Sequence, residues 1–377
     1  MTVTGIIFSN LHDTHVPELT AHRTMASVPF GCRYRFIDFA LSNMVNAGIT
    51  DVRVLTHYNY RSLMDHVGSG MDWDLSRRSG GLSIYPPYVM QAGEGNTLLK
   101  FENHLESLKS ISDIIFRLTS DLVVFSDSDA IFNLNLQAVI DSHINNNADI
   151  TCCVKTMPVT PADSSNYNFI ESDSDGNITG IVAHPKNFCG EADVAINVWV
   201  IRRSYLQRVL SDALSRDYSS FKKDIVLKRM GKDIIKVYRY DGYYGIPYSL
   251  GDYFEVSMKM LDPENRKELF NVKNRPVYTK VRNSPPTIHV EGSKVTNSLI
   301  ADGCIIEGEV ENSILFRGVR VGKGAVVKNS ILFQDTQISS DVSVNCVVAD
   351  KNVVIRSGVQ LSGHPTMPIC IGKGRMI

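Results

Sequence analysis

Aliphatic side chains recur every six residues near the C-terminal end of the chain, and no other feature constrains the fold as strongly. They form the sets Ile300 and Ile306; Leu315, Val321 and Val327; Leu332, Ile338 and Val344; Val348 and Val354. A hexapeptide repeat predicts a parallel β-helix, in which each hexad is one short strand with its aliphatic residue pointing inward. Three hexads make a coil, and the shorter jumps between these sets predict shortened coils. Ordinary meandering strands are the alternative, but they give no reason for aligned sets.

The part of the chain before residue 260 follows a different pattern. Short β-rich apolar runs alternate with segments of helical periodicity, which is typical of a sheet with crossover helices. The predicted strands are 5–9, 51–56, 122–125, 149–156 and 194–201. The predicted helices are 36–46, 97–112 and 136–146.

Residues 262–286 fit neither pattern, because prolines stand among charged residues without a clean period. We interpret this segment as a linker that continues to residue 292. The chain then divides into an α/β domain (1–261), a linker (262–292) and a β-helix domain (293–377). A β-helix exposes strand edges that must be capped or paired, so we expect an oligomer.

Composition excludes several classes of partner. The 39 basic and 40 acidic residues give no overall field that would gather nucleic acid or an anionic membrane. No stretch is long and apolar enough for a membrane span, and residues 1–10 lack a signal-peptide pattern, so we expect a cytoplasmic protein. The seven cysteines lack CxxC spacing, which predicts reduced thiols without zinc or disulfides.

Residues 28–49 carry a specific resemblance. They read VPFGCRYRFIDFALSNMVNAGI, which is similar to the VPFGGKYRLIDFxLSNCxNSGI segment of glucose-1-phosphate adenylyltransferases (ADP-glucose pyrophosphorylases). The resemblance implies a Rossmann-like nucleotidyltransferase domain, with a mixed sheet and helices on both faces, followed by a left-handed parallel β-helix. The implied reaction converts ATP and glucose 1-phosphate to ADP-glucose and pyrophosphate with Mg²⁺, in glycogen biosynthesis.

The phosphate-binding loop of that family is altered in this chain. Family members have a GGxGxRL loop after the first strand, whose glycines let backbone N–H groups approach the triphosphate. Here Asn10 and Leu11 replace the glycines, Asp13 stands where the triphosphate would lie, and His15 replaces the arginine. We therefore expect no productive ATP binding. His12 and His15 are either a basic or metal-binding pair or polar surface, and without further ligands we prefer polar surface.

Other substrate contacts of the family are missing as well. Met25 replaces the lysine of the RxKPA motif, and the EKP motif corresponds to Ala183-His184-Pro185. Leu98 takes the place of the aspartate in the GTADA motif. The resemblance thus implies a chain that has lost its fixed charges toward both substrates.

The magnesium site is incomplete by the same comparison. Asp129 matches the first metal carboxylate, but Ile246 stands where the second is expected. Asp252 would restore the second carboxylate only in a shifted alignment, and we expect it on the following helix instead. One carboxylate does not organise the metal clamp that phosphoryl chemistry needs, so we interpret Asp129 as vestigial and expect no catalytic residue, metal or cofactor in this chain.

A kept scaffold with a degraded site resembles the GlgD-type subunits found beside an active pyrophosphorylase subunit in Gram-positive glycogen operons. The resemblance implies a regulatory subunit that assembles with a catalytic, Mg²⁺-using partner into a heterotetramer. An active or altered-specificity nucleotidyltransferase using Asp129 is the alternative. A hexapeptide acyltransferase is disfavoured because His289 and His364 lie only at the ends of the β-helix. A fold-related translation-factor subunit is disfavoured by residues 28–49.

Four arginines match cationic positions of the family: Arg23, Arg33, Arg35 and Arg320. In homologous enzymes the cleft between the domains binds anionic effectors such as sugar bisphosphates, and the planar guanidinium suits phosphate. We therefore consider these residues candidates for binding a sugar phosphate or phosphate. Salt bridges between the domains are an equally weighted alternative.

Overall fold

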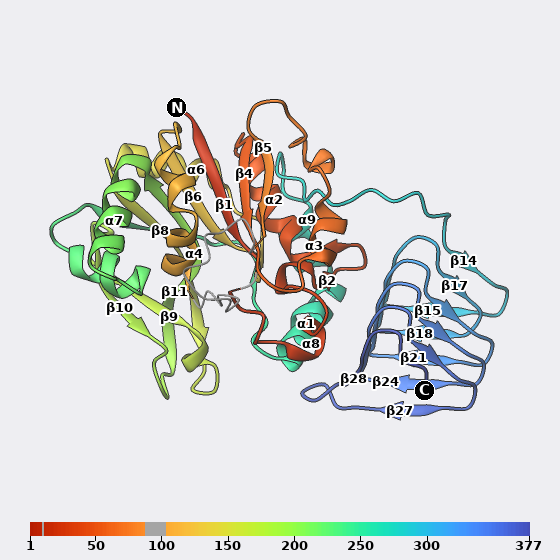
Figure 1. Ribbon diagram of the computed structural model, residues 1–377. Helices are drawn as coiled ribbons and strands as arrows, with labels where there is room; N and C mark the ends of the chain where they lie inside the picture. The colour runs from red at the N-terminus through yellow and green to blue at the C-terminus, as the bar shows by residue number, and fades with distance from the viewer. Residues whose placement is uncertain (10, 87–102) are drawn as a thin grey trace.

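The computed structural model describes residues 1–9, 11–86 and 103–377 (Figure 1). An α/β domain and a β-helix stand next to each other, and the chain ends in the β-helix (Figure 1). None of the helices in this described part of the chain has the length and apolar character that crossing a bilayer requires.

The α/β domain contains one mixed sheet, which has nine strands within the described residues. The strand order is β10-β9-β11-β6-β1-β4-β5, and β8 pairs with both β11 and β12. Strands β6, β1, β4 and β5 are parallel, whereas β11 runs antiparallel to β6. The bounds are β1 Val3–Phe8, β4 Asp51–Leu55, β5 Gly81–Tyr85, β6 Leu122–Asp127, β8 Ile150–Val159, β9 Asn168–Ser172, β10 Ile178–Ala183, β11 Gly190–Arg202 and β12 Ile235–Arg239.

Helices cover both faces of the sheet, because successive side chains of a strand point to opposite sides. Ile6 and Ile7 of β1 are both fully buried but enter different hydrophobic clusters. One cluster includes α4 (His104–Ser110), α5 (Ser112–Phe116) and α7 (Arg203–Ser215). The other includes α2 (Phe36–Asn46), α3 (Arg61–Val67) and α6 (Leu136–Asn145). The predicted fold class is confirmed.

Most predicted elements of this domain lie where the sequence pattern placed them. Helix α2 has the predicted bounds, and each of the predicted strands overlaps an observed one. The helix predicted at 97–112 lies partly outside the described residues, and its described part is divided between α4 and α5. Two short antiparallel strand pairs complete the domain: the hairpin of β2 (Pro29–Phe30) with β3 (Tyr34–Arg35), and the long-range pair of β7 (Ile131–Phe132) with β13 (Tyr244–Gly245).

The predicted linker differs from the structure at both ends. Its first residues form α9 (Pro263–Phe270), where Asp262 caps the helix by accepting from the Glu264 backbone N–H at 3.0 Å. Pro263 is the first helical residue, a position that favours proline. Near the other end, β14 (Ile288–His289) already pairs with the β-helix. The several prolines of this segment suggested an irregular structure, but the first of them, Pro263, begins a helix.

The β-helix is built from residues 288–371, all described, which form three parallel sheets of five strands each. Val321 pairs with Ile306 before it and Ile338 after it, so the coils are shorter than three full hexads, as predicted. The first sheet contains β14, β17 Ile305–Ile306, β20 Arg320–Val321, β23 Gln337–Ile338 and β26 Val354–Ile355. The second contains β15 Lys294–Thr296, β18 Glu309–Glu311, β21 Val326–Lys328, β24 Ser343–Asn345 and β27 Gln360–Ser362. The third contains β16 Leu299–Ile300, β19 Ile314–Leu315, β22 Ile331–Leu332, β25 Val347–Ala349 and β28 Ile369–Ile371.

The last predicted hexad set is wrong by one residue. Ala349 and Ile355, not Val348 and Val354, belong to the cluster inside the β-helix. Val354 is only partly buried, and Val348 faces the α/β domain. A shift of one residue along a strand moves every side chain to the opposite face. The valines at 348 and 354 have the same six-residue spacing as Ala349 and Ile355, so the spacing alone did not reveal the wrong register.

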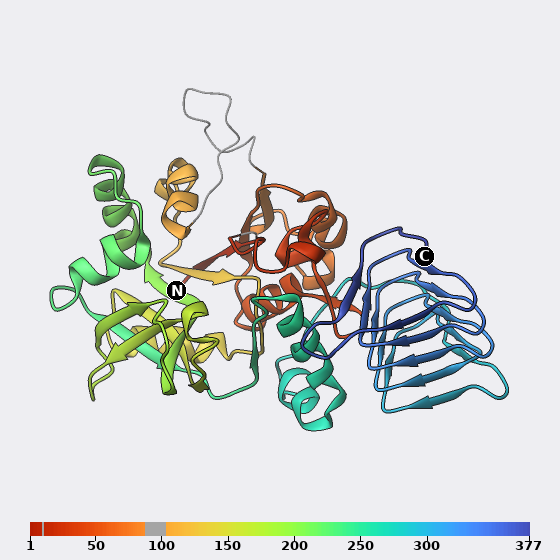
Figure 2. The same ribbon diagram turned by 90° about the horizontal axis from the view of Figure 1, so that it is seen from below.

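The third sheet is therefore apolar on both faces. Leu315 and Leu332 fill the interior of the β-helix, whereas Ile314, Ile331 and Val348 pack against the α/β domain. Their partners come from α2, from α1 (Pro17–Thr20) and from α8 (Leu250–Met258). This interdomain cluster joins the two domains through a continuous hydrophobic core, and Figure 2 shows the β-helix beside these helices from below.

Candidate functional site

A pocket of about 430 Å³ lies beside the carboxyl ends of β1 and β6, on the face of the domain where the resemblance expects the substrates. It brings together four positions that the sequence marked as altered: Leu11, His15, His184 and Ile246. The lining also includes His12, Asn103, His104, Asn166, Asn168, Ile181, Ala183, Ala195, Asn197, Ser220, Phe221, Lys222, Lys223, Leu227 and Tyr248. Asn10 and Leu98 lie outside the described residues.

His12, which lines this pocket, faces two buried carboxylates. Its Nε2 lies 3.3 Å from Asp127 Oδ2 and 3.6 Å from Asp129 Oδ2. Asp127 also pairs with His104 Nε2 at 2.7 Å. Burial alone would lower the pKa of His12, but Asp129 and Asp127 raise this pKa to about 9. His12 is therefore an imidazolium that compensates carboxylate charge, rather than polar surface.

Asp127 and Asp129 differ in the direction in which their pKa is shifted. Burial raises the pKa of Asp129 to about 6, with repulsion from Asp127 acting in the same direction. Burial would also raise the pKa of Asp127, but His104 and His12 hold it well below its usual range. Asp127 is thus a second carboxylate at this site, which sequence comparison did not identify. The acidic residue two positions before Asp129 at the same strand end was the available signal.

His15 is a neutral imidazole between two aromatic rings. It stacks on His12 with ring centroids 4.8 Å apart, and the Tyr248 ring lies 4.9 Å away. Burial, with further contributions from His12 and His184, lowers the pKa of His15 to about 4. The sequence placed this residue where the family has a permanently charged arginine, so the pocket has exchanged a fixed cation for an uncharged ring.

The predicted role of Asp13 in the pocket is not what the structure shows. The Asp13 carboxylate accepts a hydrogen bond from the Met25 backbone N–H at 2.6 Å, and the Asp13 carbonyl accepts from Thr20 Oγ1 at 2.6 Å. The Met25 side chain is 1% exposed and packs in the interdomain cluster. These hydrogen bonds hold the loop against residues 20–25. Met25, at the position of the family's lysine, is part of the hydrophobic core.

Among the described residues, the lining of this pocket contains no replacement for the missing carboxylate. Ile246 is 9% exposed and belongs to the hydrophobic cluster on the α2 face of the sheet. Asp252 lies on α8, as expected, where it accepts from the Tyr248 backbone N–H at 3.1 Å. His184 adopts a left-handed backbone conformation and shares a 2.9 Å hydrogen bond between Nδ1 and the Ser165 carbonyl.

A second pocket lies between the two domains and is lined by cations. It is small, about 30 Å³, and no acidic side chain lines it. We refer to it as the cationic pocket. Its lining is Pro29, Cys32, Arg33, Tyr34, Arg35, His66, Arg282, Phe316, Arg317, Gln334 and Lys351. Because so little volume is enclosed, an anion would contact the guanidinium groups at the mouth of the pocket.

Burial makes these cations costly. It lowers the pKa of Arg35 to about 10. Burial, together with Arg35 and Arg23, lowers the pKa of Lys351 to about 7. A cluster of partly buried like charges is the environment that an anion stabilises.

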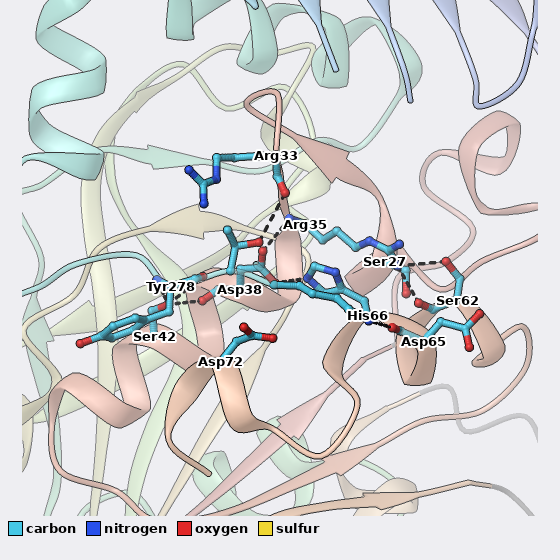
Figure 3. Close-up of polar contacts among 12 residues, drawn as sticks. Ser27, Arg33, Arg35, Asp38, Ser42, Ser62, Asp65, His66, Asp72 and Tyr278 are labelled. Atoms are coloured by element: carbon cyan, nitrogen blue, oxygen red, sulfur yellow. Dashed lines mark hydrogen bonds and ion pairs between the residues drawn. The ribbon is translucent and has the colours of Figure 1, made fainter. Parts of the chain in front are cut away.

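The side chains around Arg35 are held by a buried network. Arg35 donates to the Ser62 carbonyl at 2.6 Å and to Ser62 Oγ at 3.0 Å. Its backbone N–H donates to Asp38 Oδ2 at 3.0 Å, while Asp38 Oδ1 lies 2.6 Å from His66 Nε2. Figure 3 shows Arg35 extending toward Ser62 and His66 lying against Asp38, with Arg33 extending to the opposite side. This network positions one wall of the cationic pocket.

Two of the four predicted arginines lie outside the lining of this pocket. Both carboxylate oxygens of Asp350 lie 2.8 Å from Arg23 Nη2, in a buried pair between the domains. Arg320 is exposed on β20. The salt-bridge interpretation thus holds for Arg23, whereas Arg33 and Arg35 do line the pocket.

Arg282, Arg317 and Lys351 were missed by sequence comparison. Backbone hydrogen bonds join the residue after each of three positions to the preceding coil. These positions are therefore equivalent in successive coils, and they are occupied by Arg317, Gln334 and Lys351. Their spacing equals that of the repeat, so the coil register was the signal that could have found them.

Comparison with known proteins identifies relatives along nearly the whole chain. A family model described as nucleotidyl transferase matches residues 5–241, and one described as GlmU-like, C-terminal hexapeptide matches residues 286–366. The glycogen biosynthesis protein GlgD of Bacillus subtilis (strain 168) is 33% identical over 98% of this chain and 95% of that protein. A glucose-1-phosphate adenylyltransferase of Geobacillus stearothermophilus is 34% identical over 82% of this chain and 79% of that protein. One of Clostridium perfringens (strain 13 / Type A) is 31% identical over 89% and 84%.

Proposed function

The chain belongs to the nucleotidyl transferase family that includes GlgD and the glucose-1-phosphate adenylyltransferases, and on this basis we propose that it acts in glycogen synthesis as a regulatory, non-catalytic subunit of such an enzyme. Its partner in this proposal is a catalytic subunit that uses Mg²⁺, and the assembly is a heterotetramer. An anionic effector binds in the cationic pocket.

Ile246 is the observation that carries the non-catalytic part of this proposal. Its buried apolar side chain occupies the pocket wall where the resemblance expects the second magnesium carboxylate. The imidazolium of His12, which also lines this pocket, already pairs with Asp127 and Asp129, the carboxylates that remain. Magnesium prefers oxygen ligands in near-octahedral geometry, and here the remaining carboxylates face a histidine cation while a hydrocarbon side chain replaces the expected second metal carboxylate.

A subunit without chemistry changes its neighbour only by contacting the neighbour's active and inactive states differently. A preference of about 1–3 kcal/mol changes an apparent affinity by roughly 5–150-fold. The β-helix supports such contacts, since residues 294–296 of β15 in its first coil are exposed along a strand edge. We therefore assign the regulatory effect to the assembled interface and not to either pocket alone.

Mixing this chain with a catalytic subunit is expected to give a tetramer with higher specific activity or lower substrate KM per catalytic site than the catalytic subunit alone. Size-exclusion chromatography with light scattering measures the assembly, and a coupled pyrophosphate-release assay measures the kinetics. The control is the catalytic subunit at the same total protein concentration. Failure to form a hetero-oligomer, or kinetics identical to the control, contradicts the regulatory proposal.

The cationic pocket supports the effector part of the proposal. Arg33, Arg35 and Arg282 from the α/β side meet Arg317 and Lys351 from the β-helix. The Arg317 Nε donates to Asp302 at 3.0 Å, which orients one guanidinium without placing an acid in the lining. Both domains thus supply planar guanidinium groups to one pocket, and such groups suit a phosphoryl or sulfate group.

Anion binding to this pocket is expected to weaken by about tenfold between pH 6 and pH 8, because Lys351 must be protonated to contribute and its pKa is about 7. A bound anion favours the protonated lysine, so affinity is highest below pH 7 and falls as the pH rises. Sulfate is the suitable probe, since its own charge stays constant over this range. Isothermal titration calorimetry at fixed ionic strength measures the affinity.

The matched variants for this prediction are Lys351→Arg and Arg320→Ala. Lys351→Arg keeps a charge at every pH used and is expected to remove the pH dependence. Arg320 is exposed and outside the pocket lining, so Arg320→Ala is expected to leave sulfate binding unchanged. An unaltered pH dependence in Lys351→Arg would show that another group binds the anion.

A further inference from the structure

His12 and His15, which line the larger pocket, converge with the buried Asp129 in a way that the sequence could not indicate. Each offers one possible ligand atom, and these three atoms lie within 4.8 Å of one another. The two histidines come from the loop after β1, and Asp129 follows β6, which is the parallel neighbour of β1. Sequence comparison left the histidine pair without a third ligand, and the sheet topology supplies it.

Two atoms of this group are buried without a hydrogen-bond partner among the described residues: His15 Nδ1 and Asp129 Oδ2. Asp129 is 3% exposed, and its Oδ2 has the His12 ring nitrogen as an ion-pair partner at 3.6 Å but accepts no hydrogen bond from the described residues. A buried polar atom without a hydrogen-bond partner costs free energy. A cation that accepts a lone pair from each of these two atoms would satisfy both.

We propose that His12, His15 and Asp129 bind a divalent transition-metal ion of the zinc class. Two imidazoles and one carboxylate form a ligand set that zinc, cobalt and nickel accept, whereas Mg²⁺ and Ca²⁺ prefer oxygen ligands. The site is thus chemically distinct from a magnesium-nucleotide site, although it uses the same Asp129.

The surroundings are those of a metal site with one open position. Three protein ligands leave a fourth place for water or a small anion, and this place faces the 430 Å³ pocket and its Lys222. Asp127 is held by His104 at 2.7 Å, and its other carboxylate oxygen lies 3.3 Å from His12 Nε2, so it is a further carboxylate beside the proposed ligands.

The rival description is a closed ion pair. In it His12, paired with Asp127 and Asp129, is itself the cation of the site, and no metal enters. The two descriptions differ in whether His15 matters, because among the described residues no hydrogen bond or ion pair joins His15 to either carboxylate, and its ring contacts His12 and Tyr248. A metal needs the His15 nitrogen, whereas the ion pair needs only its ring as packing.

The test is a titration of the full-length chain, freed of metal with a chelator, with Zn²⁺ in competition with a chromophoric chelator. One Zn²⁺ per chain is expected to bind, at least about 100-fold more tightly than Mg²⁺. Co²⁺ is expected to give the visible absorption of a four-coordinate nitrogen and oxygen site. The decisive variant is His15→Phe, which keeps the ring between His12 and Tyr248 but removes the ligand nitrogen.

His15→Phe is expected to weaken Zn²⁺ binding by at least about 100-fold and to abolish the Co²⁺ absorption, and Asp129→Asn is expected to do the same. His22→Ala, at an exposed histidine near the same loop, is the matched control and should leave both unchanged. Circular dichroism and tryptophan fluorescence confirm that the variants fold. Absence of one-to-one binding, or equal binding in His15→Phe, overturns the proposal in favour of the ion pair.

This inference does not depend on the proposed regulatory function, because the assay contains no catalytic subunit and measures no turnover. A chain that binds Zn²⁺ but forms no hetero-oligomer would retain the metal site and lose the regulatory role. The opposite result would retain the role and remove the metal.

Discussion

Replacing Arg23 by alanine is expected to lower the free energy of unfolding by about 3–5 kcal/mol, because it leaves the buried carboxylate of Asp350 without its guanidinium. Arg23 and Asp350 are 2% and 3% exposed, and they connect the α/β domain to the β-helix. In the described part of the chain, the Asp350 carboxylate then keeps a 2.7 Å hydrogen bond from the Lys351 backbone N–H, which does not neutralise its charge. The expected loss of stability is the cost of leaving one buried charge uncompensated. The net stabilisation that the intact pair gives the fold is smaller than this cost.

Urea denaturation followed by circular dichroism and tryptophan fluorescence measures this effect. Both tryptophans, Trp73 and Trp199, are buried in the α/β domain, so fluorescence reports on that domain while circular dichroism reports on both. The matched control is Lys294→Ala, which breaks an exposed pair with Glu309 and is expected to cost less than about 1 kcal/mol. An equally small effect of Arg23→Ala would show that water reaches the buried pair.

The purified chain alone is expected to form ADP-glucose at least about 10³-fold more slowly than an active adenylyltransferase. One lost transition-state contact costs about 10²–10³-fold in rate, and this chain lacks several at once. The pyrophosphate-release assay on partner-free protein measures the rate. Turnover of more than a few per cent of an active homologue would favour the alternative function, an active or altered nucleotidyltransferase.

Ile246→Asp separates the missing carboxylate from the altered loop. This variant restores one acidic group on the pocket wall, yet it is expected to remain inactive because the loop at 9–16 still lacks the family's glycines and arginine. Ile246→Asn is the control, with similar size and no charge. Mg²⁺-dependent turnover in Ile246→Asp but not in Ile246→Asn would mean that the loop holds ATP after all.

The elements of the fold that depend on local pattern were predictable. Helix α2 has its predicted bounds because its signals are local: Asp38 accepts from the Arg35 backbone N–H at the start, and Gly48 takes a left-handed conformation after the end. The hexad repeat predicted the β-helix for the same reason. Its last set failed because adjacent aliphatic residues, such as Val347 and Val348, fit either face of a strand, and only contact with the other domain decides between them.

The sites depend on distant residues, and there the sequence was less informative. His12 was interpreted as polar surface because its partners, Asp127 and Asp129, follow it by more than a hundred positions. Arg320 was predicted because it matches a cationic position of the family, but Arg317 of the same hexad lines the pocket and Arg320 does not. Parallel strand pairing and coil register bring these groups together, and neither is visible in a motif.

The apolar outer face of the third sheet has a mechanical consequence. A hinge needs two surfaces that separate at low cost, whereas parting these domains would expose Ile314, Ile331 and Val348 to water together with their partners. An anion in the joint therefore cannot act by swinging the domains apart. A bound anion would instead stiffen an interdomain contact that is already closed. Any effect on a neighbouring subunit would then be transmitted by a small movement of the whole chain as one rigid body.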